Sequence, residues 1–285
     1  MPKTIAALAI VLLSLFGLWE KGYFASLESY FTPLVTDDQL VIEMIDVGQG
    51  DSIFITQGGE SMLIDTNTED YYENVKDTLN RYGVSKLDFL VATHPHSDHI
   101  GSMCEVLEDF GTEKYCYSDI ETDTYTYKSS MEFAKEYADE MSPLFAGDVF
   151  TLGDARITVL SPSEGDVPSD LNNASLVLLL EYGDFKALFT GDAEKQIEQN
   201  ILPSVPDVDV LKVGHHGSYT SSSEEFLAAC KPETALISLG EGNQYGFPHQ
   251  IVLDSLNNIG CEIFRTDLDG SVTVTVEEDG LYSVE

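Results

Sequence analysis

The chain has 285 residues, enough for one large domain or two small ones, and 43% of them are hydrophobic, which suffices for a real core. Fifty acidic residues against 14 basic ones give a formal charge of -36. A field of that sign repels nucleic acid and anionic membranes at long range, which argues against tight, non-specific binding of DNA. The excess of acid can equally be a solubilising surface coat.

The first 25 residues are predicted to be a signal peptide or a membrane anchor. Lys3 supplies a positive start, and residues 5–19 are an almost unbroken apolar run. That length suits the core of a signal peptide and is short for a full membrane span. Tyr23 and Phe24 are large where a cleavage site prefers small residues, so a cleaved signal and an uncleaved anchor both stay open. Either one predicts an extracytoplasmic protein, secreted or anchored.

Residues 26–38 are predicted to be a linker, and one domain is expected at residues 39–285. In chain order, apolar runs and turn signals predict strands at residues 40–46, 52–56, 61–65, 87–92, 149–152, 156–160, 175–182, 185–190, 208–213, 234–239, 262–266, 271–277 and 281–284. Helices are predicted at residues 71–82, 100–110, 130–140, 193–201 and 250–259, and from a Ser222 cap to Cys230. Two sheets packed face to face with helices outside, an α/β four-layer sandwich, would bring the polar strand ends to one edge.

The motif around which the chain is organised is residues 93–101, Thr-His-Pro-His-Ser-Asp-His-Ile-Gly, directly after the predicted strand 87–92. Imidazole nitrogen and carboxylate oxygen are the ligands that hold zinc, manganese or iron in hydrolytic sites. One ion can take His94 and His96, and a second can take Asp98 and His99. The other histidines of the chain are His215, His216 and His249.

Asp192 and the pair His215-His216 each follow another apolar strand, and they are the natural remaining ligands of a two-metal site. A carboxylate can bridge two ions, and a further histidine can complete the second. Two ions close together lower the pKa of a shared water and give a hydroxide near neutral pH. This is chemistry for hydrolysing an ester or a phosphodiester without a covalent enzyme intermediate.

At these motifs the sequence resembles the metallo-β-lactamase superfamily, and more narrowly the C-terminal metallohydrolase domain of competence protein ComEC and its stand-alone relatives. The matching segments are residues 46–51, 93–101, 173–180, 188–192, 209–218 and 265–267. The resemblance implies an αββα sandwich, two divalent metal ions, zinc or manganese, and phosphodiesterase or nuclease activity.

Carried over by position, the resemblance also implies a role for each site residue. His94 and His96 would hold the first metal, and Asp98 and His99 the second. Asp192 would bridge the two. His215 would complete the second position, with His216 as a catalytic group facing the substrate beside Asp98, or the two histidines would exchange roles. Asp65 would orient a ligand histidine. The expected substrate contacts are Gln49, Asp51, Asn173, Ser218 and His249.

Two departures from the family pattern stand out. No histidine occurs between His99 and Asp192, and Asn172 or Asn173 occupies the region where many members have another histidine ligand. An amide is a weaker ligand, which predicts a loosely held first metal or a preference for manganese. Relatives often have Tyr-Gly-His-Pro-His where this chain has Phe247 at the first histidine.

Three functions follow. The leading one is an exported two-metal phosphodiesterase, with DNA as a possible substrate, membrane contact through the N-terminal segment alone, and no obligate protein partner. The second is a hydrolase of a small ester, such as a phosphocholine ester or a lactone, because aromatic residues at 115–137 could bind a quaternary ammonium group. The third is a non-catalytic metal-binding relative. The four cysteines form no C-x-x-C pair and are expected to be buried free thiols.

Overall fold

The computed structural model describes residues 35, 36 and 38–285. The predicted signal or anchor segment, residues 1–25, and most of the predicted linker lie outside the described residues. Within the described part of the chain, none of the helices has the length and hydropathy needed to cross a membrane.

The first sheet has eight strands in the spatial order β15-β14-β1-β2-β3-β4-β5-β6. It is antiparallel from β15 to β3, and β3, β4, β5 and β6 run parallel to one another. The strands are β1 (Leu40–Met44), β2 (Ile53–Gln57), β3 (Glu60–Ile64), β4 (Leu87–Ala92), β5 (Thr112–Tyr117), β6 (Ala138–Pro143), β14 (Val272–Val276) and β15 (Tyr282–Val284).

The second sheet has seven strands in the order β13-β12-β11-β10-β9-β8-β7. Here β7 to β10 form antiparallel pairs, and β10 to β13 are parallel. The strands are β7 (Val149–Leu152), β8 (Ala155–Ser161), β9 (Val177–Tyr182), β10 (Phe185–Phe189), β11 (Val210–Lys212), β12 (Thr234–Ile237) and β13 (Glu262–Arg265). Each sheet therefore has one parallel half, whose strands deliver their carboxyl ends to the same edge.

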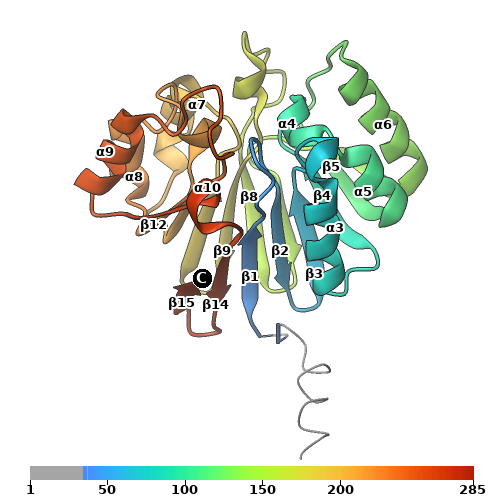
Figure 1. Cartoon of the computed structure of the whole chain (residues 1–285), viewed down its shortest axis with the longest axis horizontal. Helices are drawn as coiled ribbons and strands as arrows, with labels where there is room; N and C mark the ends of the chain where they lie inside the picture. The colour runs from blue at the N-terminus through green and yellow to red at the C-terminus, as the bar shows by residue number, and fades with distance from the viewer. Residues whose placement is uncertain (1–34, 37) are drawn as a thin grey trace, which may run out of the picture. The chain divides into compact units, whose positions relative to one another are not determined.

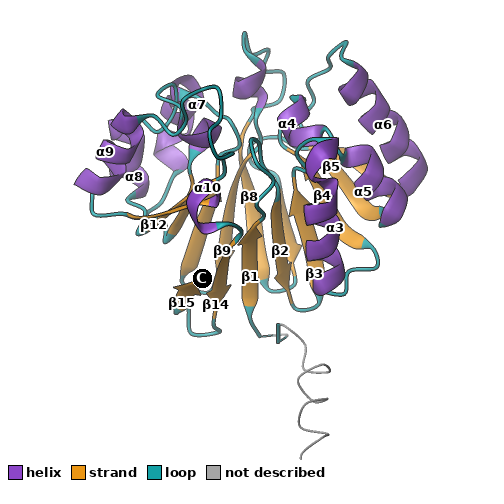
Figure 2. Ribbon diagram, in the orientation of Figure 1, coloured by secondary structure: helices purple, strands orange, loops and turns teal. Residues whose placement is uncertain are grey.

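The helices cover the outer faces of the two sheets, and the strands lie between them (Figures 1 and 2). Over the first sheet lie η1 (Glu69–Tyr71), α3 (Tyr72–Arg81), α4 (Ser97–Ile100), α5 (Met103–Asp109) and α6 (Tyr125–Tyr137). On the side of the second sheet lie α7 (Lys195–Ile201), η3 (Leu202–Ser204), α8 (Glu224–Cys230) and α9 (Gln250–Asn258). The short pieces η2 (Leu171–Ala174), η4 (Gly214–Gly217) and α10 (Thr266–Asp269) complete the set.

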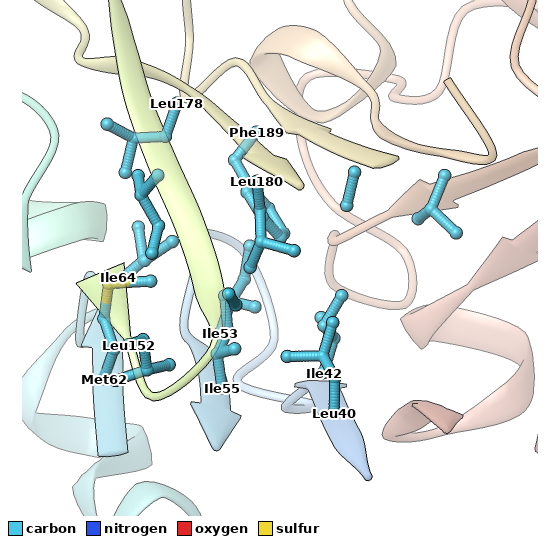
Figure 3. Packing of buried hydrophobic residues seen from close by; sticks show 14 of the residues in the cluster. Leu40, Ile42, Ile53, Ile55, Met62, Ile64, Leu152, Leu178, Leu180 and Phe189 are labelled. Atoms are coloured by element: carbon cyan, nitrogen blue, oxygen red, sulfur yellow. The ribbon is translucent and has the colours of Figure 1, made fainter. Parts of the chain in front are cut away.

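The main core lies between the sheets (Figure 3). Ile42, Ile55 and Met62 from the first sheet pack with Leu152 and Leu180 from the second, and all five are fully buried. Strand β9 also contributes to the outer cluster under α7 and α8, which explains why its residues 177–180 are all apolar. The predicted four-layer αββα sandwich is confirmed.

The last two strands of the first sheet, β5 and β6, were not predicted. Both mix charged and polar residues with apolar ones, so neither shows the apolar alternation typical of a strand. Both are added in parallel at the edge of the first sheet, where backbone pairing and not side-chain pattern defines them. The strand β6 also ends the preceding helix at Tyr137, so α6 spans Tyr125–Tyr137 and not the predicted residues 130–140.

The cap of α8 is also one residue later than predicted. The Ser223 hydroxyl accepts a hydrogen bond from the Phe226 amide at 3.3 Å, as an N-cap does. Ser222 instead has a left-handed backbone, with φ of 54°, and its amide donates to the buried carboxylate of Glu198. The Glu198 carboxylate, which lies in α7, also accepts from the Ser223 amide at 2.9 Å and so fixes the backbone before the helix.

Candidate metal centre

The candidate ligands come from the ends of strands in both sheets. His94 to His99 follow β4, Asp192 follows β10, and the pair His215-His216 follows β11. Backbone bonds join these loops: the Leu176 amide donates to the Thr93 carbonyl at 2.9 Å, and the His215 amide donates to the Gly191 carbonyl at 3.2 Å. The structure thus brings the predicted ligands of the two halves together at one edge of the sandwich.

One group of ligands surrounds His99. Its Nε2 lies 3.3 Å from Asp192 Oδ2. His216 Nε2 lies 3.8 Å from Asp98 Oδ2 and 3.6 Å from Asp192 Oδ1. Asp98, His99 and His216 offer atoms close enough together for one ion, and we name this group the second position.

Both imidazoles of the second position are oriented by hydrogen bonds at Nδ1. His99 Nδ1 donates to Asp65 at 2.7 Å, and the Thr93 amide and hydroxyl hold the same carboxylate at 2.8 and 2.6 Å. His216 Nδ1 lies 2.9 Å from the Ser238 carbonyl, which can only accept, so this nitrogen carries the proton. Each imidazole therefore turns the lone pair of Nε2 toward the centre.

A second group, which we name the first position, is formed by His94 and His96. His94 Nε2 lies 3.0 Å from His96 Nδ1 and 3.9 Å from Asp192 Oδ2. His94 is buried, and its Nδ1 has only long contacts to the hydroxyls of Thr93 and Ser175, at 3.2 and 3.3 Å. His96 is partly exposed. This position is held less firmly than the second.

The turn after β11 sends its two histidines to opposite sides of Asp192. His215 and His216 both have left-handed backbones, with φ of 49° and 53°. His216 faces Asp192 Oδ1, whereas His215 Nε2 lies 3.8 Å from Asp192 Oδ2 and its side chain is 20% exposed. The turn needs glycine at position 217, because a Cβ there would meet Pro248 at 2.5 Å. The geometry thus separates a buried histidine from a histidine at the surface.

The buried donor atoms of the centre fit a cation. Among the described residues, His99 Nε2, His216 Nε2 and Asp192 Oδ1 are buried without a hydrogen-bond partner. A buried lone pair without a partner is costly and rare in proteins. These three residues, all with ligand-type atoms, belong to overlapping groups whose atoms lie close enough together to hold divalent metal ions.

Lys212 is a charged residue at the centre that the sequence did not assign to the site. It lies in β11, is fully buried, forms an ion pair with Asp51, and donates to the Gly191 carbonyl at 2.9 Å. Its Nζ also lies 3.9 Å from Asp192 Oδ1. A lysine inside an otherwise apolar strand was the available signal, because burying an unpaired ammonium is prohibitive.

Burial and neighbouring charges shift the pKa values of side chains in the centre. Burial opposes the charge on Asp51, but Lys212 and His216 outweigh it and lower the pKa of Asp51 to about 2. Burial likewise lowers the pKa of His94 well below its usual value. For His99, burial is outweighed by Asp192 and Asp65, which raise its pKa well above the usual value. The carboxylates therefore attract a positive charge to the point where the ligand atoms converge, which is the place a metal ion would take.

The predicted substrate contacts differ in whether their side chains are already bonded within the protein. Three of them are bound within the protein: Asp51 to Lys212, the Asn173 amide to Glu194, and the Ser218 hydroxyl to Thr220. The Gln49 amide has no hydrogen-bond partner, and Asn172 Oδ1 has none either. His249 is partly exposed and its Nδ1 accepts from the Tyr219 amide at 3.1 Å.

The aromatic residues at 115–137 and the cysteines lie mainly in packed regions. Tyr115 is buried, and Tyr127 and Tyr137 pack against the cluster that covers the first sheet. All four cysteines are free, and Cys116, Cys230 and Cys261 are buried.

A sequence model described as the Metallo-beta-lactamase superfamily matches residues 45–241. The chain belongs to this superfamily. The match covers the histidine motif, Asp192 and the His215-His216 pair. Proteins of the superfamily are generally metal-dependent hydrolases and typically bind two divalent ions, and the His/Asp groups of this chain could hold them.

Curated relatives of this metallo-β-lactamase chain narrow the resemblance to competence proteins. ComE operon protein 3 of Bacillus subtilis is 35% identical over 252 residues, covering 81% of this chain and 32% of the relative. Recombination protein 2 of Haemophilus influenzae is 31% identical over 245 residues, covering 84% of this chain and 29% of the relative. The chain thus spans about a third of the length of these relatives.

Solved structures share the fold at low sequence identity. The metallo-β-lactamase fold protein YhfI from Bacillus subtilis superposes with a TM-score of 0.57 at 12% identity, covering 87% of this chain and 100% of YhfI. CmlA, a diiron β-hydroxylase from Streptomyces venezuelae, gives a TM-score of 0.57 at 13% identity, covering 85% of this chain and 55% of CmlA. At this identity the match describes the fold and not the reaction.

Proposed function

We propose that the chain is an extracytoplasmic two-metal phosphodiesterase that cleaves polynucleotides. The observation that carries the proposal is that His99, His216 and Asp192 each bury an unpartnered ligand atom and belong to overlapping groups that could hold metal ions. Support for the substrate class comes from relatives named Recombination protein 2, of Haemophilus influenzae, and Competence protein ComA, of Neisseria gonorrhoeae. Support for the location comes from the apolar run at residues 5–19.

The two ions would be held by different residues. His94 and His96, whose ring nitrogens lie 3.0 Å apart, would hold the first, and Asp98, His99 and His216 the second. Asp192 could contribute to both, because its carboxylate lies within 4 Å of His94, His99 and His216. This assignment takes the exchanged roles: His216 as the ligand and His215 at the substrate. It is supported by the burial of His216 and its 3.8 Å distance to Asp98.

When bound, the two ions would activate water and stabilise the negative charge that develops on the phosphate. The protein itself supplies position and proton handling. The Thr220 hydroxyl lies 3.1 Å from His215 Nδ1, which leaves Nε2 to face the substrate. Burial lowers the pKa of His215, so its imidazole is neutral near pH 7 and can hold or move a proton at Nε2.

Lys212 would act on the centre through charge. Its ion pair with Asp51 lies behind the ligands and offsets part of the negative charge of Asp192. The first position has two histidine ligands and no third one between His99 and Asp192, which favours manganese over zinc there.

The proposal is tested by elemental analysis and by hydrolysis of bis-p-nitrophenyl phosphate and of a single-stranded polynucleotide. The protein reconstituted with Mn²⁺ or Zn²⁺ should hold two ions per chain and cleave both substrates. The chelated protein should cleave neither. Equal cleavage before and after chelation would refute the proposal.

A small ester is the second candidate substrate. The formal charge of -36 favours it, because that charge opposes the approach of a long polyanion. Cleavage of bis-p-nitrophenyl phosphate with no cleavage of any polynucleotide would select this candidate.

A further inference from the structure

A row of aromatic rings leads from the metal centre to the surface. The Phe247 ring meets the His215 ring edge to face, with centroids 5.5 Å apart. Tyr245 stacks on Phe247 at 5.4 Å with 17° between the ring planes. On the other side His249 contacts Phe247 at 5.2 Å, and Tyr219 contacts His249 at 4.9 Å. We name Tyr219, Tyr245, Phe247 and His249 the aromatic array.

Two residues of the array are exposed and two are partly exposed. Tyr219 is 58% exposed and Tyr245 is 54% exposed, so neither contributes much to the core. Phe247 and His249 are partly exposed. Exposed aromatic rings that touch one another beside a reaction centre offer π-faces to a ligand.

The loop that carries the array is held in shape before any ligand arrives. The side-chain oxygen Oδ1 of Asn243 accepts from the backbone amides of Tyr245 and Phe247, at 3.2 and 3.0 Å. The side-chain nitrogen Nδ2 of Asn243 donates to the backbone carbonyls of Gly240 and Phe247, at 3.1 and 2.8 Å. The His249 amide donates to Gly217 in the histidine turn at 2.9 Å. A preorganised loop of this kind lowers the entropy cost of binding.

A cavity of about 260 Å³ lies at the outer end of the array. It is lined by Tyr219, Lys195 and Ser222, among others. The Ser222 hydroxyl is buried and has no hydrogen-bond partner, so a polar group of a ligand could satisfy it. The cavity therefore offers room and polar contacts for a substrate that extends past the array.

We infer that the aromatic array stacks the bases of a single-stranded nucleic acid whose phosphodiester lies at the metal centre. The inference rests on the proposed function and names its substrate class. A chain with a formal charge of -36 gains little from counterion release on a polyanion. Affinity must then come from the metal ions and from stacking, and stacking requires bases that are not paired in a duplex.

The test compares two fluorescein-labelled phosphorothioate oligonucleotides, one of thymidines and one of abasic spacers with the same charge. Binding to the Mn²⁺-loaded protein is measured by anisotropy, which does not depend on catalysis. The thymidine strand should bind about 5- to 150-fold more tightly, the range that stacking of one base provides. Tyr245→Ala should bring the ratio toward one, and Tyr245→Phe should keep it.

The matched control is Tyr125→Ala, which removes an 85% exposed tyrosine from α6 and should leave the ratio unchanged. Hydrolysis of bis-p-nitrophenyl phosphate is measured on the same samples. Equal binding of the two strands by wild type, or an unchanged ratio in Tyr245→Ala, would overturn the inference. A ratio that falls in Tyr245→Ala alongside a complete absence of hydrolysis would support the array while rejecting the proposed phosphodiesterase.

Discussion

The two metal positions of the centre differ in how their imidazoles are held. At the second position His99 donates to a buried carboxylate at 2.7 Å, and His216 donates to a backbone carbonyl at 2.9 Å. At the first position His94 has hydroxyl contacts at 3.2 and 3.3 Å, and His96 is partly exposed. A ligand fixed in its binding orientation loses less freedom when the metal arrives.

This difference predicts different roles for the two metal positions. We expect the second position to keep its ion, and the first to exchange its ion or to share it with the substrate. Asp192 lies beside both positions, because Oδ2 is 3.9 Å from His94 Nε2 and 3.3 Å from His99 Nε2, and Oδ1 is 3.6 Å from His216 Nε2. The comparison can therefore be tested by changes that affect both positions, one position, or neither.

The largest effect is expected from Asp192→Asn. The amide keeps the shape but removes the charge that both ions share, so both should bind weakly. Activity should fall by at least about 10³-fold, since the bound ions supply several kcal/mol of transition-state stabilisation. Asp184→Asn is the matched control, because Asp184 is exposed in the turn before β10 and should retain full activity. Two tightly bound ions in Asp192→Asn would contradict the shared role.

Asp65→Asn should weaken the second position alone. Asp65 holds His99 and does not face the unpartnered Nε2 atoms, so its loss should reduce metal affinity and activity by about 10- to 100-fold. Metal titration followed by calorimetry checks this expectation. If only the weaker binding step were lost, Asp65 would support the first position, and the prediction would be contradicted.

The smallest effect is expected from Thr220→Val, which removes the hydroxyl beside His215 Nδ1. If His215 acts on the substrate and is no metal ligand, both ions should stay bound. The rate should fall about 2- to 12-fold, as for one lost hydrogen bond of about 0.5–1.5 kcal/mol. Loss of an ion in this variant would mean that His215 is a metal ligand.

Much of the centre could be predicted because its ligands are contiguous in sequence or follow apolar strands. The motif at residues 93–101 shows four ligand types at one strand end, and Asp192 ends a clear hairpin. The sandwich followed from the same strands, since each alternates or continues an apolar run. Strands β5 and β6 could not be predicted in this way, because their apolar patterns are weak.

The remainder depends on geometry that no local pattern carries. The different burial of His215 and His216 follows from a left-handed turn that the sequence did not predict. The Ser238 carbonyl that orients His216 is backbone, and the pairing of Lys212 with Asp51 joins residues far apart in the sequence. These contacts become visible only once both sheets are assembled.

The most direct test of the two positions is a calorimetric titration of the metal-free protein with Mn²⁺, repeated for His96→Ala and His99→Ala. Wild type should bind two ions in two steps of different affinity. His96→Ala should lose the weaker step and keep the tight one, and His99→Ala should lose the tight step. A tight step that survives in His99→Ala and disappears in His96→Ala would contradict the account.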